Sequence, residues 1–108
     1  MRVISGSVRG LKLNAPEGLS TRPTLDRVKE AVFSMLCPYL YDAIVLDAFS
    51  GSGALGIEAI SRGAKFCVFA DNNQSAIKCI NDNLKNAKMG DRAFVFAGDV
   101  FQYIKKQD

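Results

Sequence analysis

The sequence contains no histidine, and only three cysteines and three prolines occur among its 108 residues. Without histidine, acid–base catalysis by imidazole and the common histidine-containing metal sites are excluded, and we expect no metal ion. The three cysteines are odd in number and lack the CxxC spacing of zinc or redox sites, so we expect reduced packing residues: Cys37, Cys67 and Cys79. Any catalysis must therefore use other groups.

Long apolar runs are also missing. No run approaches the roughly 18 residues of a membrane helix, and the start of the chain lacks the apolar core of a signal peptide. We therefore expect a cytoplasmic location and no membrane partner. The length, with 48% hydrophobic and 23% charged residues, suits one small soluble domain.

Positive charge is concentrated near the N-terminus. The net charge is +3, but residues 1–29 hold six basic and two acidic side chains, whereas the remainder holds eight basic and nine acidic ones. A basic segment of this kind favours an anionic partner such as RNA or DNA, because phosphate contacts supply most sequence-independent affinity. The same pattern also fits a short segment that is basic only because it is solvated.

The most informative segment is an apolar run, residues 44–46, that ends at Asp47 and continues into a glycine loop of the form GxGxxG, residues 51–56. The run predicts a buried strand and residues 54–60 predict a helix, so the glycines lie at a strand-to-helix turn. Glycine permits a sharp turn and a close ligand, and the first helical amides remain free to face that ligand. The loop therefore predicts a nucleotide-type cofactor site.

Local patterns predict the other elements. Residues 2–7 and 10–14 read as a β-hairpin, residues 15–23 as a loop, and Thr24 as the cap of a helix that ends at Pro38. After the glycine loop we expect a helix to about Arg62, a strand over 66–70, a helix ending near Gly90, a strand over 93–97 and a final helix from 100. Strands that alternate with helices predict an α/β fold, with a parallel sheet covered by helices on both faces.

Each predicted strand ends at or just before an aspartate: Asp47, Asp71 and Asp99. Aspartate is also a common cap and turn residue, so a single one would mean little. Ligands of open α/β sheets bind outside the carboxyl ends of the strands, so three in register predict one shared crevice.

The spacing alone leaves the cofactor open. Gly51 and Asp71 lie 20 residues apart, which also fits the ribose acid of a dinucleotide-binding fold. A carboxylate at Asp47 disfavours a pyrophosphate and suits a cationic ligand, and S-adenosylmethionine carries a sulfonium and an ammonium group. We expect Asp71 at the ribose, Asp99 near the adenine, and apolar contacts from Phe49 and Val100.

Three segments resemble the bacterial 16S ribosomal RNA guanine N2 methyltransferases: Arg9-Gly10, residues 19–33 with Arg22-Pro23-Thr24, and residues 46–64 with the Asp-x-Phe-x-Gly-x-Gly loop. The resemblance implies a class I methyltransferase (Rossmann-like) three-layer fold, cut after its third strand and preceded by a hairpin. It implies S-adenosylmethionine as cofactor and ribosomal RNA or the small ribosomal subunit as partner. It divides the chain into a basic hairpin and loop (1–23) and a cofactor-binding half (24–108).

The resemblance also assigns residues. Cofactor contacts fall on Thr24, Asp47, Phe49, Ser50, Gly51, Ser52, Gly53, Asp71, Asn72, Asp99 and Val100. RNA contacts fall on Arg9, Lys12, Arg22 and Arg27. The ribose position is Asp71 where glutamate is common in the family, and the Asp-Pro-Pro-Phe type motif that holds the target amine does not occur in this sequence. These 108 residues are therefore expected to be inactive alone, with no catalytic residue of their own.

Several alternatives stay open. The loop also fits a methyltransferase for exocyclic amines of DNA or another RNA, a fragment of an NAD-dependent oxidoreductase, or a noncatalytic RNA-binding module. The strand predicted at residues 44–47 would be paired on one side only and would expose an apolar edge on the other. Such an edge predicts self-association.

Overall fold

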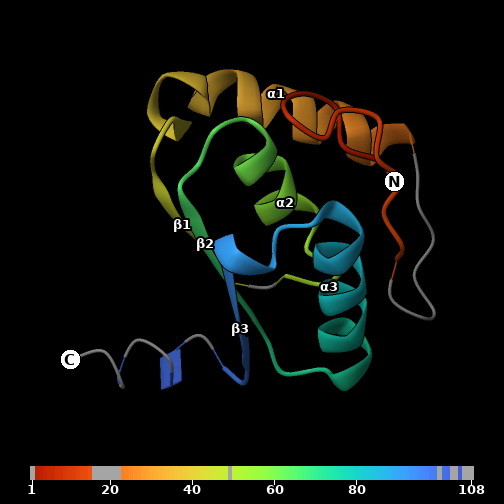
Figure 1. The fold of residues 1–108 in the computed structure, drawn as a ribbon, viewed down its shortest axis with the longest axis vertical. Coiled ribbons are helices and arrows are strands. Elements are labelled where there is room, and N and C mark those ends of the chain that lie inside the picture. The colour runs from red at the N-terminus through yellow and green to blue at the C-terminus, as the bar shows by residue number, and fades with distance from the viewer. Residues whose placement is uncertain (1, 16–22, 49, 100, 103–104, 106–108) are drawn as a thin grey trace.

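The computed structural model describes residues 2–15, 23–48, 50–99, 101–102 and 105. They form helix α1, strand β1, helix α2, strand β2, helix α3, a 3-10 turn and strand β3 (Figure 1). The bounds are α1 Pro23–Leu40, β1 Ile44–Asp47, α2 Ala54–Ser61, β2 Phe66–Asp71, α3 Gln74–Ala87, the turn Gly90–Arg92 and β3 Ala93–Ala97. The three predicted strands and the position of the glycine loop are confirmed. In the described part of the chain, no helix combines the length and apolar character needed to cross a membrane.

The three strands are parallel and follow one another across the sheet in the order β1-β2-β3. Asp47 pairs in register with Phe69, and Asp71 with Ala97. Because the strands are parallel, all three carboxyl ends lie at one edge of the sheet, as the sequence predicted.

The described residues form two layers, not the expected three. The connections from β1 to β2 through α2 and from β2 to β3 through α3 cross the sheet in the same direction. Because such connections are right-handed, both helices lie on the same face of the sheet. One strand face, with Val45 and Phe69, packs against α2 and α3 in a single hydrophobic core. The opposite face leaves Ile44 73% and Leu46 44% exposed. The prediction of helices on both faces is therefore wrong for this part of the chain.

The N-terminal β-hairpin is also not formed. Only one antiparallel bridge, between Arg2 and Lys12, joins the two arms. The amides of Ile4 and Ser5 instead donate to the Glu58 carboxylate, and those of residues 7 and 8 donate to Ser61. Within the segment, the Val3 amide donates to the Leu11 carbonyl and the Gly10 amide to the Val3 carbonyl, but the amides that would continue the ladder are bonded to α2. Two apolar residues of the segment, Val3 and Leu13, lie in the main core.

Helix ends differ from expectation in three places. α1 begins at Pro23, where a missing N–H has no cost, so Thr24 lies inside the first turn rather than before it. α1 continues past Pro38 to Leu40, because a proline in the last turn removes only one helical bond. α3 ends at Ala87, where left-handed Lys88 turns the chain and the Met89 amide donates to the Leu84 carbonyl, 3.0 Å away. The predicted end of α2 is confirmed, and the predicted final helix lies largely outside the described residues.

Candidate cofactor-binding site

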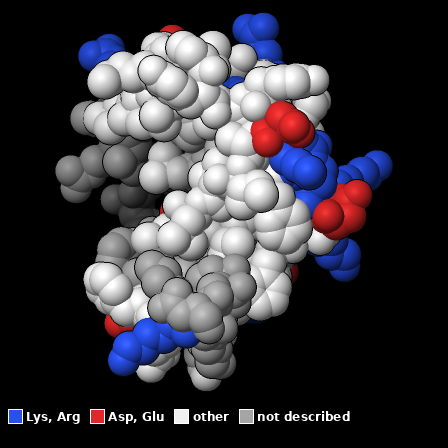
Figure 2. All heavy atoms as spheres, turned by 90° about the vertical axis from the view of Figure 1, so that its left-hand side faces the viewer, with Lys and Arg blue, Asp and Glu red and all other residues white. Residues whose placement is uncertain are grey.

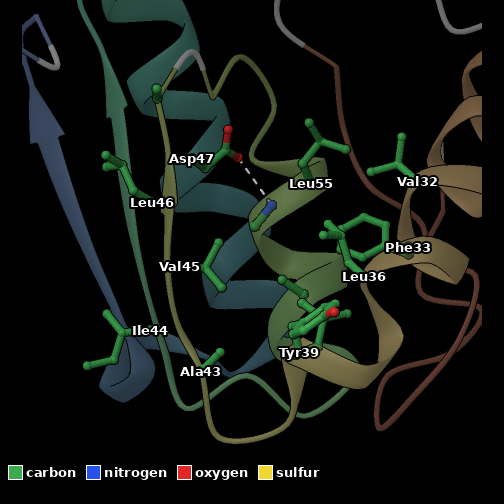
Figure 3. Close-up of a pocket in the computed structure, with 14 residues that line it drawn as sticks. Val32, Phe33, Leu36, Tyr39, Ala43, Ile44, Val45, Leu46, Asp47 and Leu55 are labelled. Carbon is green, nitrogen blue, oxygen red and sulfur yellow. Dashed lines mark hydrogen bonds between the residues drawn. The ribbon is translucent and has the colours of Figure 1, made fainter.

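Asp47 ends β1 and organises the glycine loop that follows. Its Oδ2 accepts a hydrogen bond from the Ser50 hydroxyl at 3.0 Å. The same oxygen accepts a second hydrogen bond from the Gly56 amide at 3.1 Å, which Figure 3 shows as a dashed line. A carboxylate beside the first-turn amides of α2 is favoured by the partial positive charge at a helix N-terminus. Burial raises the pKa of Asp47 despite these two hydrogen bonds, and the charge of Asp71 raises it further.

Asp71 ends β2 and connects it to the same loop. One carboxylate oxygen accepts from the Gly51 amide and the other from the Asn73 amide, both at 2.9 Å. The Ser50 amide also donates to the Ala70 carbonyl at 3.1 Å. Each carboxylate oxygen has a second lone pair, so Asp71 retains capacity to accept hydrogen bonds from ligand hydroxyls.

The glycines of the loop have different roles. Gly51 has a φ of +59° and borders open space, since a Cβ built there meets nothing within 4 Å. A Cβ on Gly56 would lie 2.3 Å from the Phe69 ring, so Gly56 allows α2 to pack closely against β2. Gly53 has a φ of +80° and packs toward Phe69 and Ile80. Only Gly51 therefore adjoins space that a ligand can use.

The third acid, Asp99, follows β3 and is exposed. Its carboxylate accepts from the Phe101 amide at 2.7 Å, and the neighbouring Gly98 amide donates to the Asp71 carbonyl at 2.9 Å. The ends of β2 and β3 are thus joined beside the glycine loop. The structure brings Asp47, Asp71 and Asp99 to one edge, with exposed Asn72 between the second strand and α3.

Some predicted site residues cannot be placed. Phe49, Val100 and Arg22 lie outside the described residues, and for Thr24 only the helical backbone is described. Arg9 and Lys12 are exposed on the N-terminal segment, and Arg27 is exposed on α1. Arg9 also lines a small pocket of about 300 Å³ with Arg2, near the exposed Glu30.

The sequence prediction missed Asn83, which is fully buried on α3. Its Nδ2 donates to the Ser52 carbonyl of the glycine loop at 2.8 Å and to the Asn14 carbonyl at 2.9 Å, while its Oδ1 accepts from the Asn14 amide at 2.8 Å. One side chain therefore connects the cofactor loop to the N-terminal segment. Its position beside Ile80 and Leu84, on the apolar face of a predicted helix, was the signal available in the sequence.

The fold and the loop define a Rossmann-like domain of the methyltransferase type. This chain is similar to the solved structure of the Escherichia coli protein yhhF, with a TM-score of 0.85 and 41% sequence identity. The match covers 95% of this chain and 55% of the yhhF chain. The C-terminal domain of precorrin-6Y C5,15-methyltransferase from Rhodobacter capsulatus covers 84% of this chain and 47% of its own, with a TM-score of 0.71. At 18% identity, that second match concerns the fold alone.

The chain belongs to the family described as Conserved hypothetical protein 95, which matches residues 1–108. YlbH of Bacillus subtilis (strain 168) is 50% identical over 99 residues, covering 92% of this chain and 54% of that protein. Ribosomal RNA small subunit methyltransferase D of Escherichia coli (strain K12) is 41% identical over 95 residues, covering 88% of this chain and 48% of that protein. The resemblance found in the sequence is confirmed, and the chain spans about half the length of these relatives.

Proposed function

We propose that this chain is the cofactor-binding half of an S-adenosylmethionine-dependent methyltransferase that modifies the N2 amine of a guanine in small-subunit ribosomal RNA. The observation that carries the proposal is the glycine loop held between Asp47 and Asp71, in a chain 41% identical to a relative named for small-subunit ribosomal RNA. That relative's name also supports a cytoplasmic location, beside the RNA.

The cofactor contacts are proposed residue by residue. Open space at Gly51 and the remaining acceptor capacity of Asp71 fit an adenosine whose ribose hydroxyls donate to that carboxylate. Exposed Asp99 suits the amino edge of the adenine. The rest of the proposed contact set is Thr24, Asp47, Phe49, Ser50, Ser52, Gly53, Asn72 and Val100. The chemistry that S-adenosylmethionine supplies when bound is an activated methyl group on a sulfonium.

The RNA side of the site is proposed on residues 1–23 together with the start of α1, and the cofactor side on residues 24–108. Arg9, Lys12 and Arg27 are exposed and therefore available to phosphates, and Arg22 belongs to the same proposed set. Such contacts hold an RNA in register but carry little sequence information.

These 108 residues are proposed to lack methyl transfer on their own. A guanine N2 amine is a weak nucleophile, so an enzyme must orient it and accept its hydrogen bonds. The three prolines, Pro16, Pro23 and Pro38, are not adjacent, so the sequence contains no Pro-Pro motif to do this. Methyl transfer from this chain clearly above background would contradict the proposal.

A thermal-shift experiment tests the cofactor. S-adenosylhomocysteine should raise the melting temperature by mass action, and NAD should not. Asp71→Asn should remove most of the shift because it weakens the ribose acceptor, whereas Asp91→Asn changes an exposed aspartate of the 3-10 turn and should leave it intact. A shift with NAD alone, or none with either ligand, would reject the proposed cofactor.

We also propose that two copies of the 108-residue chain associate through β1. A groove of about 590 Å³ lies between α1 and β1, with exposed Leu36 and Tyr39 on one side and Leu46 on the other. Figure 3 shows Ile44 and Leu46 pointing away from the helices. Among the described residues visible in Figure 2, which faces the left-hand side of Figure 1, most are neither acidic nor basic. Antiparallel pairing of two β1 edges about a twofold axis would provide each edge with partners and cover apolar side chains.

Sedimentation equilibrium tests this association. Ile44→Lys should shift the chain to monomer, because it introduces charge on the exposed face of β1. Phe94→Lys makes the same change on β3, at the other end of the sheet, and should leave the dimer intact. A wild-type chain that stays monomeric at high concentration would contradict self-association.

A further inference from the structure

Glu58 is a fully buried acid in the middle of α2 that the cofactor site does not use. Its Oε1 accepts from the Ile4 amide at 2.9 Å and its Oε2 from the Ser5 amide at 3.1 Å. The same two oxygens contact Lys29 Nζ at 3.2 Å and Arg62 Nε at 2.8 Å. Among the described residues, both salt bridges end on this one carboxylate.

The two cations connect Glu58 to separate parts of the molecule. Lys29 comes from α1, is itself buried, and also donates to the Arg2 carbonyl at 2.7 Å. Arg62 caps the C-terminal end of α2, one turn after Glu58, and its guanidinium lies 5.0 Å from the centre of the Phe33 ring on α1. Glu58 therefore joins the N-terminal segment, α1 and α2 at one point. Breaking a buried pair of this kind is costly because it leaves uncompensated charge.

Backbone contacts hold the same segment directly against α2. The Ser7 amide donates to the Ser61 carbonyl at 2.8 Å, and the Ser61 hydroxyl donates to the Ser5 carbonyl at 2.6 Å and accepts from the Val8 amide at 3.1 Å. Gly6 has a φ of +96°, and a Cβ there would lie 1.8 Å from the Ser61 carbonyl oxygen. The segment therefore approaches α2 more closely than any side chain at position 6 would permit.

We infer that Glu58 is a positioning residue for RNA: it holds the segment carrying Arg9 and Lys12 in a fixed place relative to the cofactor loop. α2 begins at Ala54, directly after that loop, so Glu58 lies one helical turn from it on the same rigid element. Phosphate contacts set the register of a nucleic acid, and small displacements of positioning groups are costly in rate. The inference rests on the proposed RNA substrate.

Glu58→Gln tests the inference. The glutamine keeps the size of the side chain but removes the charge that holds Lys29 and Arg62, so the N-terminal segment should loosen. Binding of a fluorescein-labelled RNA hairpin, followed by anisotropy, should weaken about tenfold, and the slope of log affinity against log salt should fall by about 1.5, equivalent to two lost phosphate contacts. Affinity for S-adenosylhomocysteine, measured by calorimetry, should stay within about twofold. Asp82→Asn removes an exposed acid from α3 and should leave RNA binding unchanged.

A milder variant keeps the test decisive if Glu58→Gln does not fold. Ser61→Ala removes two hydrogen bonds to the same segment and leaves every charge in place, so it should weaken RNA binding in the same selective way. In a variant that already lacks Arg9 and Lys12, either change should have little further effect, because the groups being positioned are gone.

The outcomes separate the inference from the proposed function. If the wild-type chain shows no salt-dependent RNA binding, the RNA substrate itself is rejected. If the wild-type chain binds and the folded variants bind equally well, only the positioning role is rejected. Equal weakening of RNA and S-adenosylhomocysteine binding, together with a lower melting temperature, would show a purely structural role and would also overturn the inference.

Discussion

Replacing Asn83 by aspartate should destabilise the protein strongly, although the two side chains have the same shape, because it removes two donated hydrogen bonds and introduces a buried negative charge. The side-chain nitrogen of Asn83 donates to the carbonyls of Ser52 and Asn14, and the oxygen of an ionised aspartate cannot donate to either. A buried group left without its partner costs about 1–3 kcal/mol. The Asn14 contact is partly accessible to water, so we expect the free energy of unfolding to fall by about 2–4 kcal/mol. That is a large part of a typical total of about 5–15 kcal/mol.

Urea unfolding followed by circular dichroism measures this loss. Asn81→Asp provides the matched control, because Asn81 lies on the same helix and is exposed. The aspartate at 83 should also weaken binding of S-adenosylhomocysteine, since the Ser52 carbonyl belongs to the glycine loop. If the two variants unfold within about 0.5 kcal/mol of each other, a spread typical of surface substitutions, the bridge through Asn83 does not stabilise the fold as argued.

Three further outcomes are expected. Gly56→Ala should lower the melting temperature much more than Gly51→Ala, because the new Cβ at position 56 would lie 2.3 Å from the buried Phe69 ring. Equal effects of the two substitutions would contradict the packing role of Gly56. Burial alone would raise the pKa of Glu58, but hydrogen bonds from the Ile4 amide, Arg62 and Lys29 lower it from 4.5. The ionised Glu58 therefore stabilises the fold above pH 4.5, and this stabilisation is lost as the pH falls through the pKa of the folded state. The stability difference between wild type and Glu58→Gln should therefore narrow in acid, and a constant difference from pH 7 to 3 would refute this. Burial raises the pKa of the Cys67 thiol to about 12, so a thiol reagent should modify exposed Cys37 before Cys67 in the native chain. Equal rates of modification at Cys37 and Cys67 would contradict the burial of Cys67.

Features set by local sequence were predictable. The strand at 44–47 and the helix from 54 follow from an apolar run, a glycine turn and helix formers, which act over a few residues. The three aspartates could be assigned to one edge because parallel strands impose it. What the sequence could not give is the use of Asp47 and Asp71 as acceptors for loop amides, since that depends on how the loop closes in three dimensions.

Features set by distant contacts were not predictable. Residues 2–14 alternate as a hairpin would, but the amides of residues 4, 5, 7 and 8 bond to Glu58 and Ser61, more than 50 residues away. Nothing near Ile4 or Ser5 in the sequence identifies a buried carboxylate as their partner. In the described residues, the coverage of only one sheet face follows likewise from the direction of both crossovers, which a pattern of alternating helices and strands does not specify.

The docking of residues 2–14 onto α2 and α3 has a consequence for biosynthesis. The partners of this segment on α2 and α3 lie 53 to 69 positions later, so these contacts cannot form while the segment itself is being made. At about 5–20 residues per second, the nascent segment waits for several seconds before Ser61 and Asn83 leave the ribosome. During that interval Val3 and Leu13 have no core to enter, so residues 2–14 reach their native places only after α2 and α3 have been made.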